Sequence, residues 1–115
     1  MGIIYHIATV PDWSRAREGG EYRTSTRGRT LEQQGFIHAS TEQQVAPVAN
    51  AVYAGERDLV VLVIDEAKVT SEVLYESVPG WDQPFPHIYG PLNADAVLKT
   101  IPLVADADGR FSFPS

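Results

Sequence analysis

Short apolar runs separated by glycine, proline and polar residues recur along the chain, a pattern typical of many short β-strands. The strongest run is Leu59–Ile64, which is uninterrupted and predicts a buried strand. Ile3–Ala8 lies between Gly2 and Pro11 and predicts a first strand at the centre of a sheet. Further strands are predicted at residues 36–40, 73–76, 87–90 and 97–101, and an edge strand or loose tail at 111–113.

The first helical pattern covers residues 12–18. It turns Trp13 and Ala16 inward, and Thr9 or Asp12 can cap its N-terminus. Two consecutive glycines follow, and they predict the end of this short helix.

A second and longer helix is predicted over residues 41–53. Ser40 and Gln43 match a capping box at its start. Its apolar positions follow helical spacing and are Val45, Val48, Ala49, Val52 and Tyr53. Pro47 removes a backbone donor inside this helix, so we expect a local bend or a late helix start.

Two segments carry no clear periodicity. Residues 21–34 predict an exposed excursion with one short strand at Tyr22. Residues 79–86 are rich in proline, which excludes a central strand, and predict a loop that covers one end of the sheet. Seven or so strands beside two helices predict an α+β fold in a single domain, residues 1–115.

Composition narrows the classes of function. Hydrophobic residues make up 43% of the chain and charged residues 21%, as in ordinary globular proteins. Without cysteine, a thiolate zinc site and a cysteine nucleophile are excluded. A net charge of −6 argues against general nucleic-acid or membrane binding. No apolar run approaches the roughly 20 residues that cross a bilayer, and no secretory signal pattern is present, so we expect a cytoplasmic protein.

The basic residues are unevenly distributed. Five of the nine lie between positions 15 and 29. The segment is either a local anion-binding loop or a solvated surface loop, and the second interpretation is favoured for Arg27 and Arg29.

All three histidines, His6, His38 and His87, lie in predicted strands. An imidazole among β-branched and aromatic residues is expected to be buried and to need partners, and it can act as an acid, a base or a hydrogen-bond donor. We therefore predict that the three converge on one catalytic site. The alternative for His6 is a core histidine bonded to a neighbouring carbonyl.

Neighbours in the same strands extend the predicted site. His38 and Ser40 share a strand face, and Ser40 could bind a phosphate at a helix N-terminus or act only as a cap. His87 and Tyr89 also share a face, where they could hold a base or a nicotinamide. The alternative is an aromatic core cluster with Phe85.

Four further residues are candidates. Thr9, Trp13 and Tyr22 complete the predicted substrate-binding set, although large aromatics in a small domain are more often core and Thr9 can be a helix cap. Glu76 is the best candidate for a catalytic carboxylate, and its alternative is a surface strand residue. Three histidines could also bind zinc, but no His-x-His or His-Glu-x-x-His spacing supports a metal, and none is predicted.

Three stretches, residues 5–7, 35–40 and 85–92, resemble a small family of mainly bacterial proteins known as domain of unknown function 952. The resemblance covers nearly the whole chain and includes Trp13 and Gln44. It implies a fold similar to the ADP-ribosyltransferase superfamily: a split, mixed β-structure with two main helices that holds NAD or a related nucleotide in a central cleft.

The resemblance also implies roles for individual residues. His6 matches the position that holds a ribose hydroxyl in that superfamily, and residues 36–40 resemble the histidine-bearing strand of its RNA 2′-phosphotransferase branch. The glutamate that orients the ribose has no clear counterpart near His87 and Tyr89 in the sequence. Ala39 stands where cysteine is common in the family, which bears only on a thiol role.

These observations predict binding of NAD, ADP-ribose or a phosphorylated nucleotide, with NAD as substrate and ADP-ribosyl or phosphoribosyl-type transfer as the reaction. His6 would orient the ribose, while His38 or His87 would act as acid or base. The alternative is a non-catalytic ligand-binding or protein-interaction module. A histidine-based, metal-dependent hydrolase is third. The sequence does not predict an oligomeric state.

Overall fold

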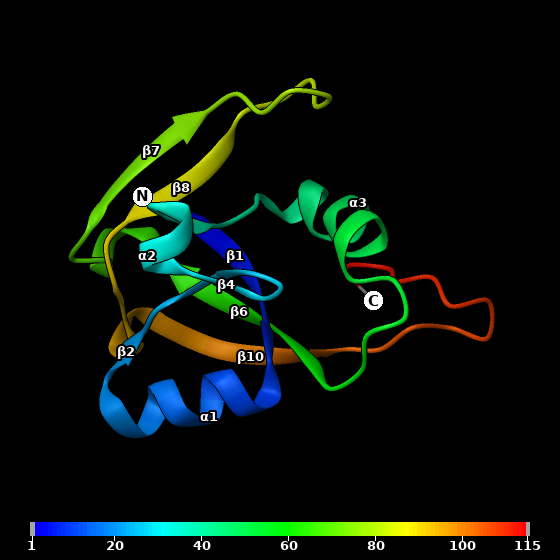
Figure 1. Cartoon of the computed structure of the whole chain (residues 1–115), viewed down its shortest axis with the longest axis horizontal. Helices are drawn as coiled ribbons and strands as arrows, with labels where there is room; N and C mark the ends of the chain where they lie inside the picture. The colour runs from blue at the N-terminus through cyan, green and yellow to red at the C-terminus, as the bar shows by residue number, and fades with distance from the viewer. Residues whose placement is uncertain (1, 115) are drawn as a thin grey trace.

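The chain folds into ten short strands, three α-helices and two 3₁₀ helices within residues 2–114, the part that this computed structural model describes (Figure 1). The strands are β1 (Ile3–Thr9), β2 (Glu21–Tyr22), β3 (Thr24–Thr26), β4 (Arg29–Thr30), β5 (Ile37–His38), β6 (Leu59–Asp65), β7 (Glu72–Glu76), β8 (Phe85–Tyr89), β9 (Leu92–Asn93) and β10 (Val97–Leu103). The helices are α1 (Val10–Gly19), α2 (Leu31–Gln34), α3 (Glu42–Val52), η1 (Glu66–Lys68) and η2 (Ala94–Ala96). The predicted α+β class is confirmed.

The main sheet has the strand order β1–β6–β10. Ile3 pairs with Asp65 and Thr9 with Leu59, so β1 runs antiparallel along the whole of β6. β6 is therefore the central strand of this sheet, and β1, predicted as central, lies beside it with its other edge bridged from Tyr5 to Ser40. β6 carries apolar residues on both faces, and such a strand is stable where other elements cover both of its faces.

The second sheet has the order β5–β8–β7, and it is joined to the first by an isolated bridge between Tyr5 and Ser40. Its middle strand contains Pro86, where a loop was predicted; that part of the prediction was wrong. Proline is tolerated because the short partner β5 ends at His38, and the Pro86 carbonyl still accepts a hydrogen bond from Ala39 at 2.9 Å.

All strand pairs in residues 2–114 are antiparallel, so the predicted mixed β-structure was also wrong. Two further two-stranded pairs, β2–β9 and β3–β4, complete the β-structure. The second pair and α2 occupy the segment predicted as an exposed excursion. Thr30 and Gln33 form a capping box there, which explains why a polar segment is ordered.

The N-terminus of α1 is capped as its sequence predicts, whereas the capping residues of α3 lie one position later than predicted. The Thr9 side chain accepts from Asp12 N–H at 3.2 Å at the start of α1. α3 is capped by Thr41 and Gln44, not by the predicted Ser40 and Gln43, because Ser40 pairs through its backbone with Tyr5. The helix runs through Pro47 from Glu42, so no late start occurs.

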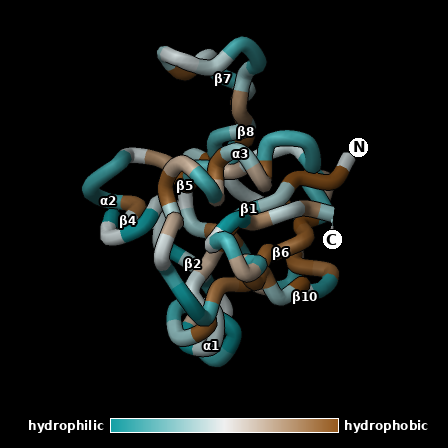
Figure 2. The backbone as a smooth tube through the Cα atoms, turned by 90° about the vertical axis from the view of Figure 1, so that its right-hand side faces the viewer, coloured by the Kyte–Doolittle hydropathy of each residue, from teal (hydrophilic) through white to brown (hydrophobic). Residues whose placement is uncertain are grey.

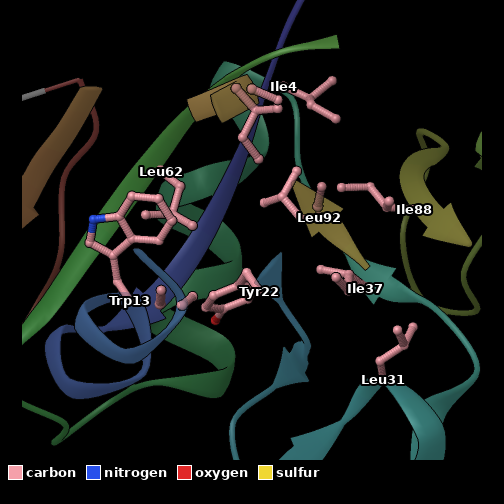
Figure 3. Packing of buried hydrophobic residues seen from close by; sticks show 13 residues of the cluster. Ile4, Trp13, Tyr22, Leu31, Ile37, Leu62, Ile88 and Leu92 are labelled. Carbon is pink, nitrogen blue, oxygen red and sulfur yellow. The ribbon is translucent and has the colours of Figure 1, made fainter. Parts of the chain in front are cut away.

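Two hydrophobic clusters lie on opposite faces of β6. Leu62 and Ile64 belong to the cluster that includes Trp13 and Ala16 of α1, whereas Val61 belongs to the cluster formed with α3. Figure 3 shows Leu62 beside Trp13. Figure 2 shows the apolar stretches of β6 and β10 side by side. The C-terminal segment is not loose, because Phe111 is buried and joins the α3 cluster. No helix in the described residues is long and apolar enough to cross a membrane.

Candidate functional site

The β5–β8–β7 sheet brings the predicted residues of three chain segments onto one face. His38 lies directly opposite His87 in the register of β5 and β8. Because side chains alternate along a strand, His87 and Tyr89 point to the same side. Their neighbours Ile37 and Ile88 point to the other side and are fully buried in the core. The sheet is thus anchored by its apolar face and carries its polar chemistry on the opposite face.

Glu76 is the centre of the hydrogen bonding on this face. His87 Nδ1 lies 2.6 Å from Glu76 Oε1, and the Tyr89 hydroxyl donates to the same oxygen at 2.5 Å. The hydrogen bonds from Tyr89 and then His87 lower the pKa of Glu76, which is therefore ionised at neutral pH. The hydrogen bond to Glu76 in turn raises the pKa of Tyr89. The pairing of β7 with β8 thus places a carboxylate beside His87 and Tyr89.

His87 is buried, yet one of its nitrogens has no partner. Its side chain is 4% exposed, and Nε2 makes no hydrogen bond within the described residues. Phe36 stacks on the imidazole with ring centroids 4.0 Å apart and planes at 18°. When Nδ1–H of an uncharged imidazole donates to Glu76, the Nε2 of the same ring is a hydrogen-bond acceptor. A buried acceptor without a partner is costly and calls for an explanation.

His38 stands beside His87, with ring centroids 5.4 Å apart. Burial, followed by the charges of His6 and His87, lowers the pKa of His38 to about 4. His38 is therefore neutral at physiological pH and can serve as a hydrogen-bond acceptor or donor, or as a base. Its backbone is held by Ser25, whose hydroxyl accepts from His38 N–H at 3.3 Å.

His6 lies behind this face, and its ring is fully engaged. Nδ1 donates to the His38 carbonyl at 2.5 Å, and Nε2 accepts from the Tyr22 hydroxyl at 3.0 Å. The two contacts fix a single neutral tautomer. Burial lowers the pKa of His6 to about 4. In this arrangement the His6 ring fixes the backbone of His38 through its carbonyl, which is the contact expected of a core histidine bonded to a neighbouring carbonyl.

Ser40 and His38 line a small cavity with His6, as their shared strand face predicts. The cavity measures about 10 Å³, which holds at most one water molecule. A nucleotide therefore has no preformed chamber here, and a ligand of that size must bind on the open face over β8.

The other predicted contacts are not brought to His87. Trp13 and Tyr22 are buried in the hydrophobic cluster beside α1, where Figure 3 shows both rings among apolar side chains. Thr9 caps α1 at the far end of β1. Burial raises the pKa of Tyr22, whose hydroxyl donates to His6 Nε2.

A larger cavity of about 710 Å³ lies elsewhere, lined by residues 55–60 and 102–107 together with Val10 and Gly109. Its lining contains no histidine and no aromatic side chain. Because the reactive side chains gather on the other sheet, we place the candidate site on the β5–β8–β7 face. Within residues 2–114 no three His, Asp or Glu side chains are arranged to hold a metal ion.

Comparison with known proteins gives the family. The model of the family described as "Protein of unknown function (DUF952)" matches residues 7–100. The chain belongs to this family. No protein of curated function matches it.

Solved structures of one related protein share the fold. The crystal structure of CC0527 from Caulobacter crescentus is 29% identical, with a TM-score of 0.84 over 96% of this chain and 94% of that one. The crystal structure of a double mutant of CC0527 matches equally well. The solution NMR structure of CC0527 is 30% identical, with a TM-score of 0.78 over 96% of this chain and 91% of that one. The likeness to ADP-ribosyltransferases stays a prediction.

Phe36 is the site residue that sequence reasoning missed, since it was assigned only to a strand. The signal for it was the alternation of Phe36 with His38, which places both on the histidine face. For Glu76 the residue was named, but its contact with His87 depends on the pairing of β7 with β8. Strand register of this kind is a tertiary property.

Proposed function

We propose that the β5–β8–β7 face binds the nucleoside part of a nucleotide, with NAD and ADP-ribose as first candidates, and that Glu76 and His87 act there as an acid–base pair. The observation that carries this proposal is the buried, unpartnered Nε2 of His87, whose opposite nitrogen is oriented by an ionised carboxylate. A base oriented in this way is suited to take a proton from a hydroxyl group. Phe36 and Tyr89 add aromatic faces on which a flat ring can stack.

In the proposed reaction an acceptor hydroxyl attacks C1′ of the nicotinamide ribose. The bond between C1′ and the nicotinamide nitrogen breaks, nicotinamide leaves with the bonding electron pair, and the hydroxyl proton passes to His87 Nε2. Glu76 stabilises the resulting imidazolium. His38 contacts the ligand from β5, and His6 positions the His38 backbone.

A heteronuclear NMR titration of the histidine side chains with NAD, ADP-ribose and a 2′-phosphorylated nucleotide tests binding. The expected result is a saturable shift at His38 and His87, with a smaller shift at His6, which lies behind them. Silence at all three imidazoles would sink the proposal.

Turnover is tested by nicotinamide release from NAD in the presence of small hydroxyl acceptors. His87→Gln should lower the rate by roughly 100-fold or more, the usual contribution of a general acid–base group. Glu66→Gln is the matched control, since Glu66 bonds Tyr75 and not His87. Equal rates in the wild type and His87→Gln would remove His87 from the reaction.

The second candidate function is a non-catalytic binding module. The small volume of the cavity beside His38 favours it. The cavity beside His38 is about 10 Å³, and Phe36 covers His87. Saturable nucleotide binding without nicotinamide release would support the module, whereas release that depends on His87 would exclude it.

A further inference from the structure

The exposed side of the candidate site carries two carboxylates. Glu72, Leu74 and Glu76 alternate along β7 and so share one face, and Leu74 lies directly opposite His87. Glu72 lies opposite Tyr89 and raises the pKa of its phenol together with Glu76. Leu74 is 40% exposed, so an apolar surface lies between the two acids.

In the part of the chain that the structure describes, these carboxylates have no lysine or arginine partner. Within residues 2–114, neither Glu72 nor Glu76 forms an ion pair with a lysine or an arginine. Two arginines nearer the N-terminus pair elsewhere: Arg23 with Glu21 and Glu32, and Arg27 with Glu56. No lysine or arginine in the described residues therefore offsets the negative charge of this face, which repels anionic groups.

The unpartnered nitrogen of His87 points to the same kind of ligand by an independent route. Nε2 is buried, accepts hydrogen bonds in the tautomer that donates to Glu76, and has no donor in the described residues. A ligand that satisfies it must bring an N–H or O–H group and must displace the Phe36 ring that covers the imidazole.

Aromatic rings complete the surroundings. Phe36 and Tyr89 lie with centroids 5.5 Å apart and planes at 48°. A cation within about 6 Å of a ring centroid is attracted to the ring face, and the attraction grows when the site is shielded from water. Carboxylates, aromatic faces and a buried acceptor together form a consistent recognition surface.

We infer that the part of the ligand held by Glu72, Glu76, His87 and Tyr89 is an organic cation that carries an N–H or O–H donor. This inference rests on the proposed function for the location of the site and names the class of its ligand. The cation could belong to a dinucleotide, as the nicotinamide ring of NAD does, or to a free small molecule.

The test compares two probes that differ in charge. 1-Methylnicotinamide is a planar cation with a carboxamide, and nicotinamide is its neutral counterpart. In an NMR titration, 1-methylnicotinamide should shift His87 and Tyr89 and saturate at a concentration at least about tenfold lower, a difference of about 1.4 kcal/mol. Equal affinity for both probes would overturn the inference.

Two variants locate the charge effect. Glu72→Gln is exposed and outside the proposed acid–base pair, and it should weaken the cation about threefold without changing the neutral probe. Glu66→Gln is the control, because Glu66 bonds Tyr75, whose side chain lies on the other face of β7, and should leave both affinities unchanged. Equal weakening by the two variants would place the cation away from this face.

Three nucleotides separate this inference from the proposed function. NAD carries the cationic ring, whereas NADH and ADP-ribose lack it. Tighter binding of NAD than of either relative supports both proposals. Equal binding of all three keeps the nucleotide function and overturns the cation, while selective binding of 1-methylnicotinamide with no binding of any nucleotide keeps the cation and overturns the nucleotide function.

Discussion

His6 on β1 and His87 on β8 are both almost completely buried, but the protein treats their two rings differently. Around His6 it supplies both partners, the carbonyl of His38 and the hydroxyl of Tyr22. Around His87 the described residues supply one partner, Glu76, and leave Nε2 without a hydrogen bond. A buried imidazole with both nitrogens satisfied stabilises the fold, whereas one that keeps an open acceptor costs stability and is suited to a ligand.

The largest effect should come from truncating the inner histidine. His6→Ala leaves the Tyr22 hydroxyl and the His38 carbonyl without their partner and opens a cavity, so the free energy of unfolding should fall by about 3 kcal/mol. His87→Ala should cost about half as much, because it removes an unsatisfied nitrogen along with its contacts. Urea unfolding measures both values, and equal losses would contradict the distinction between the two sites.

Acid should destabilise the protein through the inner histidines. The pKa of His6 is lowered to about 4 in the folded state, against about 6.5 when unfolded. The unfolded chain therefore binds more protons between these values, and the stabilisation present above pH 6.5 is lost as the pH falls toward 4. The two pKa values differ by about 2.5, which at roughly 1.4 kcal/mol per pKa unit corresponds to about 3–4 kcal/mol.

The contribution of His6 is isolated by His6→Gln, which removes the titrating group. The stability difference between the wild type and this variant should shrink between pH 7 and pH 4. A difference that does not change with pH would show that His6 does not titrate in this range.

Removing the stacked ring should have a smaller effect. Phe36→Leu keeps apolar volume but loses the aromatic contact with His87, and we expect a loss of about 1 kcal/mol in the free energy of unfolding. The same change should expose the His87 imidazole. Faster histidine Cε1 hydrogen exchange at His87, with no such change at His6, would measure this difference, and unchanged exchange at both would contradict it.

The smallest effect on stability is expected at Glu76. Glu76→Gln retains an acceptor for Tyr89 and is partly exposed, so the free energy of unfolding should change by less than about 1 kcal/mol. Ligand binding at His87 should weaken much more than stability does. A large loss of stability would mean that the Glu76–His87 pair serves the fold and not a ligand.

Local patterns predicted the parts of the fold that depend on local physics. The unbroken Leu59–Ile64 run is the buried central strand, and the spacing around Trp13 gave α1 with its inward face. The alternation of His87 and Tyr89 correctly placed both on one face, because strand periodicity needs no tertiary information.

The failures came where tertiary pairing decides between local alternatives. Ser40 with Gln43 and Thr41 with Gln44 fit the same capping pattern, and the backbone bridge from Ser40 to Tyr5 selects the second. Pro86 was excluded from a central strand because the early end of β5 could not be foreseen. The partners of His6 and the reach of Glu76 to His87 likewise depend on strand register.

The position of β6 has a consequence for how fast the chain folds. This strand lies between the two hydrophobic clusters and contributes side chains to each of them. Its partner β1 is distant in sequence, since Ile3 lies opposite Asp65 and Thr9 opposite Leu59. The chain must close a long loop before either cluster can form, and the entropy of that closure opposes the transition state. Folding should therefore take milliseconds to seconds rather than microseconds, and substitutions in β6 should slow it more than substitutions in β7.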